Sequence, residues 1–250
     1  MIKINGANQI PWVVVTGLDG SGKTTLVDNL EKFFQDKDLK VKRTRSPHDE
    51  YLTKTLLNVS GSGSPDADSY TDRTIFMLDN RILGSRIKEW RDSGEYDLIL
   101  SQRGFFDAFV HGKVKDYPYH VTAEFNRVWE LPKCQVMIHL VANAETAFER
   151  IKDDPDADKF ETLEYMEVQE EETRKGFEAL KRRKDSALSH FFDCVNIYID
   201  TTNLTTDETY EIAIKRLAAI MEFWKKECVC LLDRRIRFFW LILNIVIKYC

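Results

Sequence analysis

The feature that most constrains this chain is a glycine-rich segment near its N-terminus, which reads Gly17-Leu18-Asp19-Gly20-Ser21-Gly22-Lys23-Thr24. It has the spacing G-x-x-x-x-G-K-T and lies between an apolar strand candidate, 12–16, and an amphipathic stretch, 24–36. Glycines let the backbone curl so that its N–H groups point inward at the start of the following helix. The segment therefore predicts a strand–turn–helix unit that binds phosphate.

The residue types of this loop predict which atoms hold a ligand. Lys23 is placed to reach the β- and γ-phosphates, and the hydroxyl of Thr24 is placed to bind a metal ion. A nucleoside triphosphate and Mg²⁺ are therefore the expected ligands, with Thr24 as the metal-binding residue. A turn that only joins a strand to a helix is disfavoured, because Lys-Thr directly after the last glycine is rare by chance. The nucleotide-binding residues expected are Gly17, Leu18, Asp19, Gly20, Ser21, Gly22, Lys23, Thr24 and Thr25.

Short β-branched runs alternate with longer helical stretches along the chain, a pattern typical of a parallel sheet covered by helices. The strand candidates are 12–16, 40–45, 96–101, 135–141 and 195–200. The helix candidates are 24–36, 51–59, 71–93, 121–130, 144–152, 163–186 and 207–227. We expect an α/β, three-layer fold with a five-stranded parallel sheet and helices on both faces.

The C-terminal segment differs in composition from the rest of the chain. We expect one folded domain at 1–227 and a basic and apolar tail at 228–250. The apolar run 238–247 would rise only about 15 Å as a helix, short of a bilayer core of roughly 30 Å, so no membrane span is expected. A packed final helix, an interfacial or partner-binding helix and a poorly ordered end remain open for this tail.

Charge and cysteine content limit the partners and the compartment. The net charge of −5 argues against a broad basic surface for duplex DNA, although a local basic cleft stays open. The five cysteines show no zinc-ligand spacing, so reduced thiols are expected. Residues 1–9 lack the pattern of a signal peptide. These features predict a cytoplasmic protein, with a small nucleotide as partner and homodimer formation left open.

Further features separate the classes of protein that share a phosphate-binding loop. No Asn-Lys-x-Asp motif occurs, which disfavours a GTPase switch. Arginines follow the second and third strand candidates, at Arg45 and Arg103, and Arg73 and Arg81 lie on the long helix. Ligands of such sheets bind beyond the carboxyl ends of the strands, where a second phosphorylated molecule needs cations. The acidic segment 153–159 lies between two helices, where a closing lid would exclude water.

The chain resembles the thymidylate kinases from residue 10 to about residue 224. The loop Gly17 to Thr25 is close to the loop of that family. The other matching segments are Thr44-Arg45-Ser46-Pro47, similar to Arg-Glu-Pro; Asn80-Arg81; and Asp158-Lys159-Phe160-Glu161, similar to Asp-Arg-Phe-Glu. Ser101-Gln102-Arg103 lies where the family has Asp-Arg-Tyr.

The resemblance implies a three-layer P-loop kinase fold with a short lid, so that residues 1–227 would form a P-loop nucleotide kinase domain. It further implies transfer of the γ-phosphoryl group of ATP–Mg²⁺ to a thymidine-type pyrimidine nucleotide. It also implies that Asp19 contacts the acceptor sugar and that Arg150 lies near the adenine. Arg45, Arg81 and Arg103 would hold the acceptor phosphate. The catalytic residues expected are Lys23, Asp19, Arg103, Asp107 and Lys159.

Departures from the family pattern gather around the acceptor. Gln102 is neutral where the family has an acid, and Gly104 replaces an aromatic residue, which would open space. Asp107 is either a group that takes a proton from an acceptor hydroxyl or a helix cap. Lys159 replaces the lid arginine, and Gly20 leaves no arginine in the phosphate-binding loop. Lys159 or Lys152 would therefore have to supply the missing positive charge.

These departures leave two further functions open. The first is a kinase that phosphorylates the hydroxymethyl group of 5-hydroxymethyluracil in phage DNA, a known variation on this fold. The second is a non-catalytic nucleotide-binding regulator that has lost its acid. A transfer assay with free and polymeric acceptors would separate the three.

Overall fold

The computed structural model describes residues 10–47, 55–56, 69–107, 110, 131–153, 162–182 and 194–228. Its sheet consists of β1 (Trp12–Gly17), β2 (Val41–Arg45), β3 (Leu98–Gln102), β4 (Val136–Val141) and β5 (Val195–Asp200). The strands are in the order β2-β3-β1-β4-β5, and every neighbouring pair is parallel. The five expected strands and their parallel arrangement are confirmed, with bounds that differ by up to two residues.

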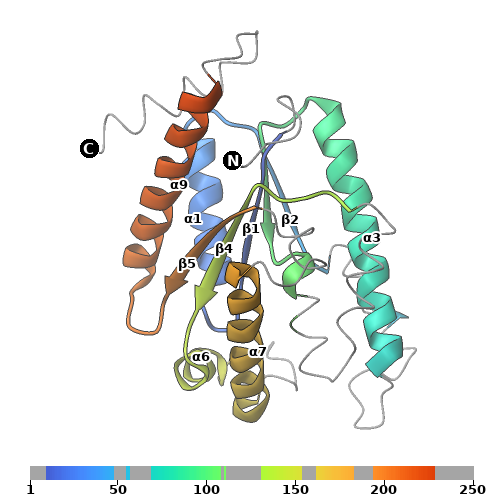
Figure 1. Ribbon diagram of the computed structural model, residues 1–250, viewed down its shortest axis with the longest axis vertical. Coiled ribbons are helices and arrows are strands. Elements are labelled where there is room, and N and C mark those ends of the chain that lie inside the picture. The colour runs from blue at the N-terminus through green and yellow to red at the C-terminus, as the bar shows by residue number, and fades with distance from the viewer. Residues whose placement is uncertain are drawn as a thin grey trace.

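The helices form a layer on each face of this sheet (Figure 1). One face is covered by α1 (Lys23–Gln35) and α9 (Thr206–Cys228), and the other by α3 (Ser69–Ser93) and α7 (Leu163–Arg182). The short helix α6 (Ala144–Ile151) lies beside α7 and follows β4. The result is the expected three-layer fold. The helix expected at 121–130 and the tail beyond residue 228 lie outside the described residues.

Two apolar clusters on opposite faces of the sheet hold the layers together. On one face, Leu30 of α1 and Leu217 of α9 pack with alternate residues of the central strands. On the other face, Leu83 of α3 and Phe177 of α7 pack with the intervening residues of the same strands, such as Met137 of β4. Leu30 and Leu83 are fully buried, and burial of a side chain of this size stabilises the fold by about 2 kcal/mol. Burial on both faces explains why the central strands are continuous apolar runs.

The parallel arrangement places the carboxyl ends of all strands at one edge of the sheet. Val15 of β1 is opposite Gln102 of β3, and Gly17 is opposite Leu140 of β4. The loop after β1, Arg103 after β3 and the segment after β5 therefore start at the same edge. In the part of the chain described here, no helix has both the length and the apolar character needed to cross a membrane.

Candidate active site

The loop between β1 and α1 has a conformation that two of its glycines make accessible. Gly20 has a φ of 76° and Gly22, the N-cap of α1, has a φ of 91°, both in the left-handed region that favours glycine. At Gly22 a Cβ atom would meet open space, so only the backbone conformation requires glycine. At Gly20 a Cβ atom would lie 2.1 Å from the carbonyl oxygen of Ala147 in α6. The contact with α6 therefore explains why no arginine stands at this point of the loop.

Lys23 lies inside this loop rather than in solvent. Only 4% of its surface is exposed. Its Nζ donates hydrogen bonds to the carbonyl oxygen of Leu18, at 2.6 Å, and to Oδ1 of Asp19, at 3.0 Å. Burial lowers the pKa of Lys23, and the neighbouring carboxylate of Asp19 opposes that shift. The ammonium group is thus held at the start of α1, where the loop is expected to bind phosphate.

Arg103 reaches the same loop from the end of β3. Its φ of 65° is unusual for a residue with a side chain. Its N–H donates to the carbonyl oxygen of Val15 at 2.7 Å, and its carbonyl oxygen accepts from Ser101 Oγ at 2.6 Å. In this conformation its guanidinium group forms an ion pair with Asp19. Three expected catalytic residues, Asp19, Lys23 and Arg103, are therefore brought together.

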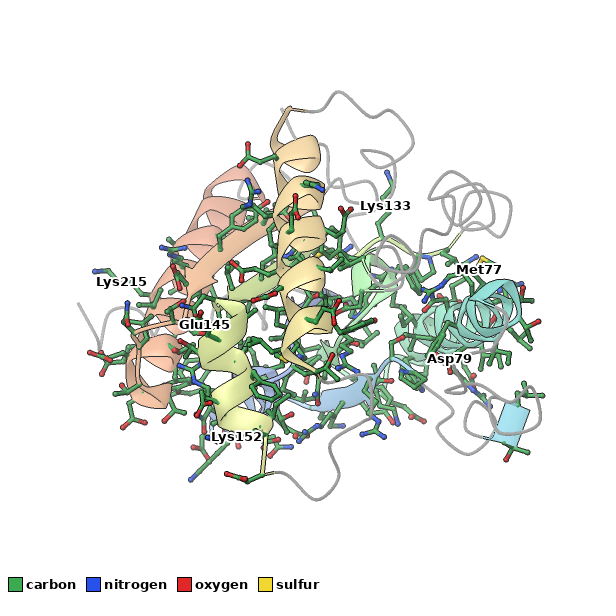
Figure 2. All side chains as sticks on the ribbon, turned by 90° about the horizontal axis from the view of Figure 1, so that it is seen from below. Met77, Asp79, Lys133, Glu145, Lys152 and Lys215 are labelled. Carbon is green, nitrogen blue, oxygen red and sulfur yellow. The ribbon has the colours of Figure 1, made fainter. Side chains whose placement is uncertain are left out.

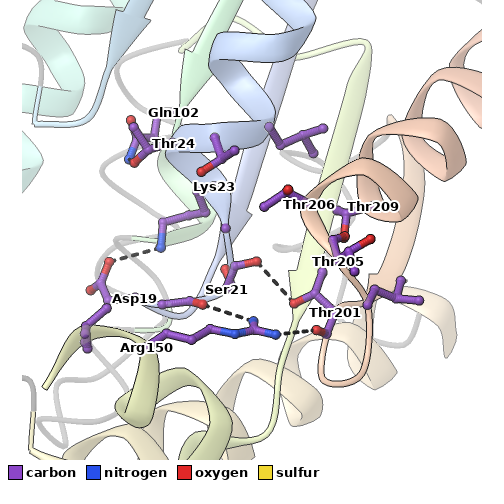
Figure 3. A pocket seen from close by; sticks show the side chains of 16 residues that line it. Asp19, Ser21, Lys23, Thr24, Gln102, Arg150, Thr201, Thr205, Thr206 and Thr209 are labelled. Atoms are coloured by element: carbon purple, nitrogen blue, oxygen red, sulfur yellow. Dashed lines mark hydrogen bonds and ion pairs between the residues drawn. The ribbon is translucent and has the colours of Figure 1, made fainter.

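A cavity of about 520 Å³ opens at this loop (Figure 3). That volume lies in the range of roughly 300–1,000 Å³ typical of small-molecule sites. The loop and the first turn of α1 form one side of it, and the segment after β5 forms the other. The lining residues are Asp19, Gly20, Ser21, Gly22, Lys23, Thr24, Thr25, Leu26, Gln102, Arg150, Ile151, Thr201, Leu204, Thr205, Thr206 and Thr209.

Arg150 of α6 connects the two sides of this cavity. Its guanidinium group donates to the carbonyl oxygens of Gly20 at 3.2 Å, Thr201 at 2.8 Å and Thr202 at 3.4 Å. The hydroxyl of Thr201 donates to the carbonyl oxygen of Ser21 at 3.1 Å. These contacts fasten the phosphate loop to the segment between β5 and α9. Arg150 therefore lines the cavity, while a contact with adenine stays a prediction.

The threonine side of the cavity was missed in the sequence. Thr201 follows β5 directly, and Thr205, Thr206 and Thr209 lie at the start of α9. Their position in the chain could have indicated them, because residues just after a parallel strand lie at the ligand-binding edge of the sheet. The run of threonines by itself resembles an ordinary helix start. The hydroxyl of Thr205 indeed accepts a hydrogen bond from the N–H of Glu208 at 3.2 Å, as an N-cap residue does.

Gln102 touches the expected metal-binding residue. Its Nε2 donates to the hydroxyl oxygen of Thr24 at 3.0 Å. Among the described residues, no group of three or more His, Cys, Asp or Glu side chains could hold a metal ion. Mg²⁺ commonly keeps several waters and binds through one or two carboxylates together with substrate phosphates. The Thr24 hydroxyl and the Asp19 carboxylate, which line the same cavity, are oxygen donors of the kind that Mg²⁺ prefers.

Asp107 is buried behind the loop. Its Oδ1 accepts from the hydroxyl of Thr16 at 2.7 Å, and its Oδ2 accepts from the N–H of Gly104 at 2.8 Å. Burial raises the pKa of Asp107, while Arg103 and these two hydrogen bonds lower it. Both carboxylate oxygens thus hold the turn after β3, in the way an acidic side chain in the first helical turn caps the residue three positions earlier. This geometry fits a cap better than a proton acceptor.

Gly104 does not open space for an acceptor, so that interpretation of the sequence is wrong. A Cβ atom at Gly104 would lie 3.1 Å from a methyl carbon of Val14 and 3.9 Å from the ring of Trp12. The direction in which a side chain would leave this position faces the core beneath the sheet edge. The glycine lets the turn after β3 pack closely against β1 and removes no wall from the site.

A second cavity, of about 450 Å³, adjoins the first through Thr24 and Gln102. It follows β2 and is lined by Thr24, Lys42, Arg43, Thr44, Arg45, Trp90 and Gln102. Arg45 is exposed at the end of β2 and lines this cavity. The two cavities thus share Thr24, the residue expected to bind metal, and its hydrogen-bond partner Gln102.

The other expected cations lie elsewhere. Arg81 donates from α3 to Ser85 Oγ at 2.7 Å and lines neither of these two cavities. Arg73 is buried against the ring of Phe76, at 5.4 Å. Lys152 extends from the end of α6 (Figure 2) and pairs with Glu149 at 2.6 Å, so it lines neither cavity. Lys159 lies outside the described residues.

The fold and the site together define a class, the three-layer α/β kinases with a phosphate-binding loop. The sequence is similar to proteins named probable thymidylate kinase from three archaea. With that of Archaeoglobus fulgidus it is 26% identical over 155 residues, 62% of this chain and 76% of the relative. With that of Methanothermobacter thermautotrophicus it is 26% identical over 143 residues, 56% and 68% of the two chains. With that of Metallosphaera sedula it is 28% identical over 150 residues, 60% and 69%.

No protein-family model matches the chain. The similarity to these relatives nevertheless agrees with the motifs and with the fold. The chain is thymidylate kinase-like, and its enzyme class is that of the kinases, which transfer phosphoryl groups.

Proposed function

We propose that this protein transfers the γ-phosphoryl group of ATP, with Mg²⁺, to a thymidine-type pyrimidine nucleotide. The observation that carries the proposal is the pair of adjoining cavities. One lies at the phosphate-binding loop, and the other is lined by an exposed arginine, Arg45. They meet at Thr24 and Gln102, so a donor in the first and an acceptor in the second would face each other.

The donor binds in the first cavity. The loop N–H groups and Lys23 would hold the phosphates, because a buried ammonium at a helix N-terminus favours anions. Thr24 would contribute a metal ligand, and bound Mg²⁺ supplies charge neutralisation on the β- and γ-phosphates. Arg150 and the threonines after β5 would lie around the nucleoside.

The acceptor binds on the side of Arg45 and Arg103. Its phosphate would be held by guanidinium groups, which suit phosphate because they offer paired donors in one plane. Lys159 would add positive charge from the lid, whereas Arg81 donates to Ser85 and lines neither cavity. Phosphoryl transfer has a loose transition state, so the contribution of these residues is positioning and charge neutralisation.

The acceptor is tested by presenting the full chain with labelled ATP and Mg²⁺ to several acceptors in parallel. The acceptors are dTMP, the other deoxynucleoside monophosphates, and DNA that contains 5-hydroxymethyluracil. We expect label in dTMP. Label in the DNA alone would refute the proposed acceptor, and nucleotide binding without transfer would indicate a regulator.

The donor assignment is tested with Lys23→Ala, which should abolish transfer to every acceptor, since the ammonium group at the loop is lost. Lys32→Ala is the matched control, because Lys32 is an exposed lysine of the same helix. That control should retain wild-type transfer. Robust activity in Lys23→Ala would refute the assignment.

A further inference from the structure

The cations of the loop are already occupied by an anion of the chain itself. Asp19 Oδ1 lies 3.0 Å from Lys23 Nζ and also forms an ion pair with Arg103. One carboxylate oxygen therefore joins a lysine of the loop to an arginine that follows a different strand. Figure 3 shows the Asp19 carboxylate facing the Lys23 ammonium at the wall of the cavity.

The ion pair with Asp19 stabilises the buried positive charge of Lys23 in the ligand-free protein. Lys23 is buried, and a buried charge without an opposite charge beside it is strongly destabilising. Burial lowers the pKa of Lys23, and Asp19 is the largest influence that opposes this shift. Asp19 thereby helps to keep the lysine charged and in place when no ligand is bound.

Asp19 can also leave this position. Its side chain is 23% exposed and lines the cavity, whereas the side chain of Lys23 is 4% exposed. Phosphate oxygens accept the same charge-assisted hydrogen bonds from lysine and arginine as a carboxylate does. A phosphate that enters the cavity therefore meets Lys23 at its wall. The carboxylate of Asp19, which also lines the cavity and pairs with both Lys23 and Arg103, then competes with that phosphate.

We propose that Asp19 is an intramolecular stand-in for a phosphoryl group, which holds Lys23 and Arg103 in the ligand-free protein and gives them up when a phosphate ligand binds. The inference rests on the proposed function, since it takes the loop as the site of the donor phosphates. It goes further because Asp19 then competes with those phosphates. Once displaced, the same carboxylate is available to the metal ion or the acceptor.

The competition is tested with Asp19→Asn, which keeps the size of the side chain and removes its charge. The probe is inorganic tripolyphosphate, titrated by calorimetry in the presence of EDTA, so that no role of Asp19 as a metal ligand affects the result. We expect Asp19→Asn to bind tripolyphosphate about tenfold more tightly than wild type, because one ion pair no longer has to be broken.

Two control variants separate this effect from a general change of charge. Asp28→Asn removes one negative charge from α1, where the exposed side chain of Asp28 pairs with Arg43 at 2.6 Å. Asp19→Glu keeps the charge at the loop. Both should bind tripolyphosphate within about twofold of wild type, since the charge of an exposed, ion-paired carboxylate is screened and a retained carboxylate at position 19 still competes.

The outcomes are distinct. Equal or weaker binding by Asp19→Asn, or the same gain in Asp28→Asn, overturns the stand-in role while leaving the donor site intact. If wild type binds neither tripolyphosphate nor ATP, the donor assignment fails as well. Circular dichroism establishes that each variant is folded, and Asp19→Ser repeats the test if the asparagine variant does not fold.

Discussion

Gly20 offers a sharp test of the packing that shapes the phosphate loop. In Gly20→Ala, a Cβ atom at the present backbone position would lie 2.1 Å from the carbonyl oxygen of Ala147. Ordinary contacts of this kind are more than 1 Å longer, so the loop has to move away from α6. The left-handed φ of 76° adds a cost of about 1 kcal/mol for a residue with a side chain.

The two contributions give the expected magnitude. Overpacking against a fixed backbone costs about 2 kcal/mol, so the free energy of unfolding should fall by about 3 kcal/mol in total. For a chain of 250 residues this corresponds to a loss of about 8 °C in Tm. The measurement is chemical and thermal unfolding without nucleotide, followed by circular dichroism.

Gly94→Ala is the matched control. Gly94 has a φ of 68°, and a Cβ atom there would meet open space. It carries the conformational cost without the clash, so it should lower the free energy of unfolding by only about 1 kcal/mol. Equal losses in the two variants would refute the reasoning, because the contact with Ala147 would then contribute nothing.

Two other predictions follow from buried polar groups. Burial lowers the pKa of His139 to about 3, below its value in the unfolded chain, so the unfolded state binds the proton more strongly. The contribution of neutral His139 to the free energy of unfolding is then fully present above about pH 6.5. The free energy of unfolding falls by up to about 1.4 kcal/mol per pH unit as the pH is lowered from there to about 3. Urea unfolding at several pH values measures this slope, and His139→Gln should reduce it; an unchanged slope would contradict the assignment. Asp107→Asn should lower the free energy of unfolding by about 1–2 kcal/mol, because the asparagine cannot accept both hydrogen bonds. It should slow transfer to phosphate and hydroxyl acceptors equally, and a selective loss with hydroxyl acceptors would restore the proton-accepting role.

Local patterns in the sequence were sufficient for the fold and the centre of the site. The loop Gly17 to Thr24 is built from backbone N–H groups and a helix N-terminus that are adjacent in the sequence, so eight consecutive residues specify its structure. The parallel sheet was predictable because burial on both faces requires continuous apolar runs, as in β1 and β4. Arg45 and Arg103 were found because chain position after a strand fixes the sheet edge.

Contacts between distant segments could not be derived in this way. Gly104 was interpreted as an opening toward an acceptor, but a side chain there would meet Val14 of β1. Asp107 was interpreted as either a proton acceptor or a cap, and it accepts a hydrogen bond from Thr16 of β1. These partners belong to β1, whereas Gly104 and Asp107 follow β3. No local sequence pattern encodes which side chains of two such segments contact each other. The same holds for Arg150, whose carbonyl acceptors lie in two separate segments.

What the sequence determined by itself is therefore a phosphate-binding loop at the edge of a parallel sheet, since both depend on the order of nearby residues. Only the tertiary structure decided how charge is balanced there. It brought Arg103 to Asp19 across 84 positions of the chain and buried Lys23 beside the same carboxylate. Electrostatic pairing depends on distance in space and on exclusion of water, and packing of the whole fold sets both.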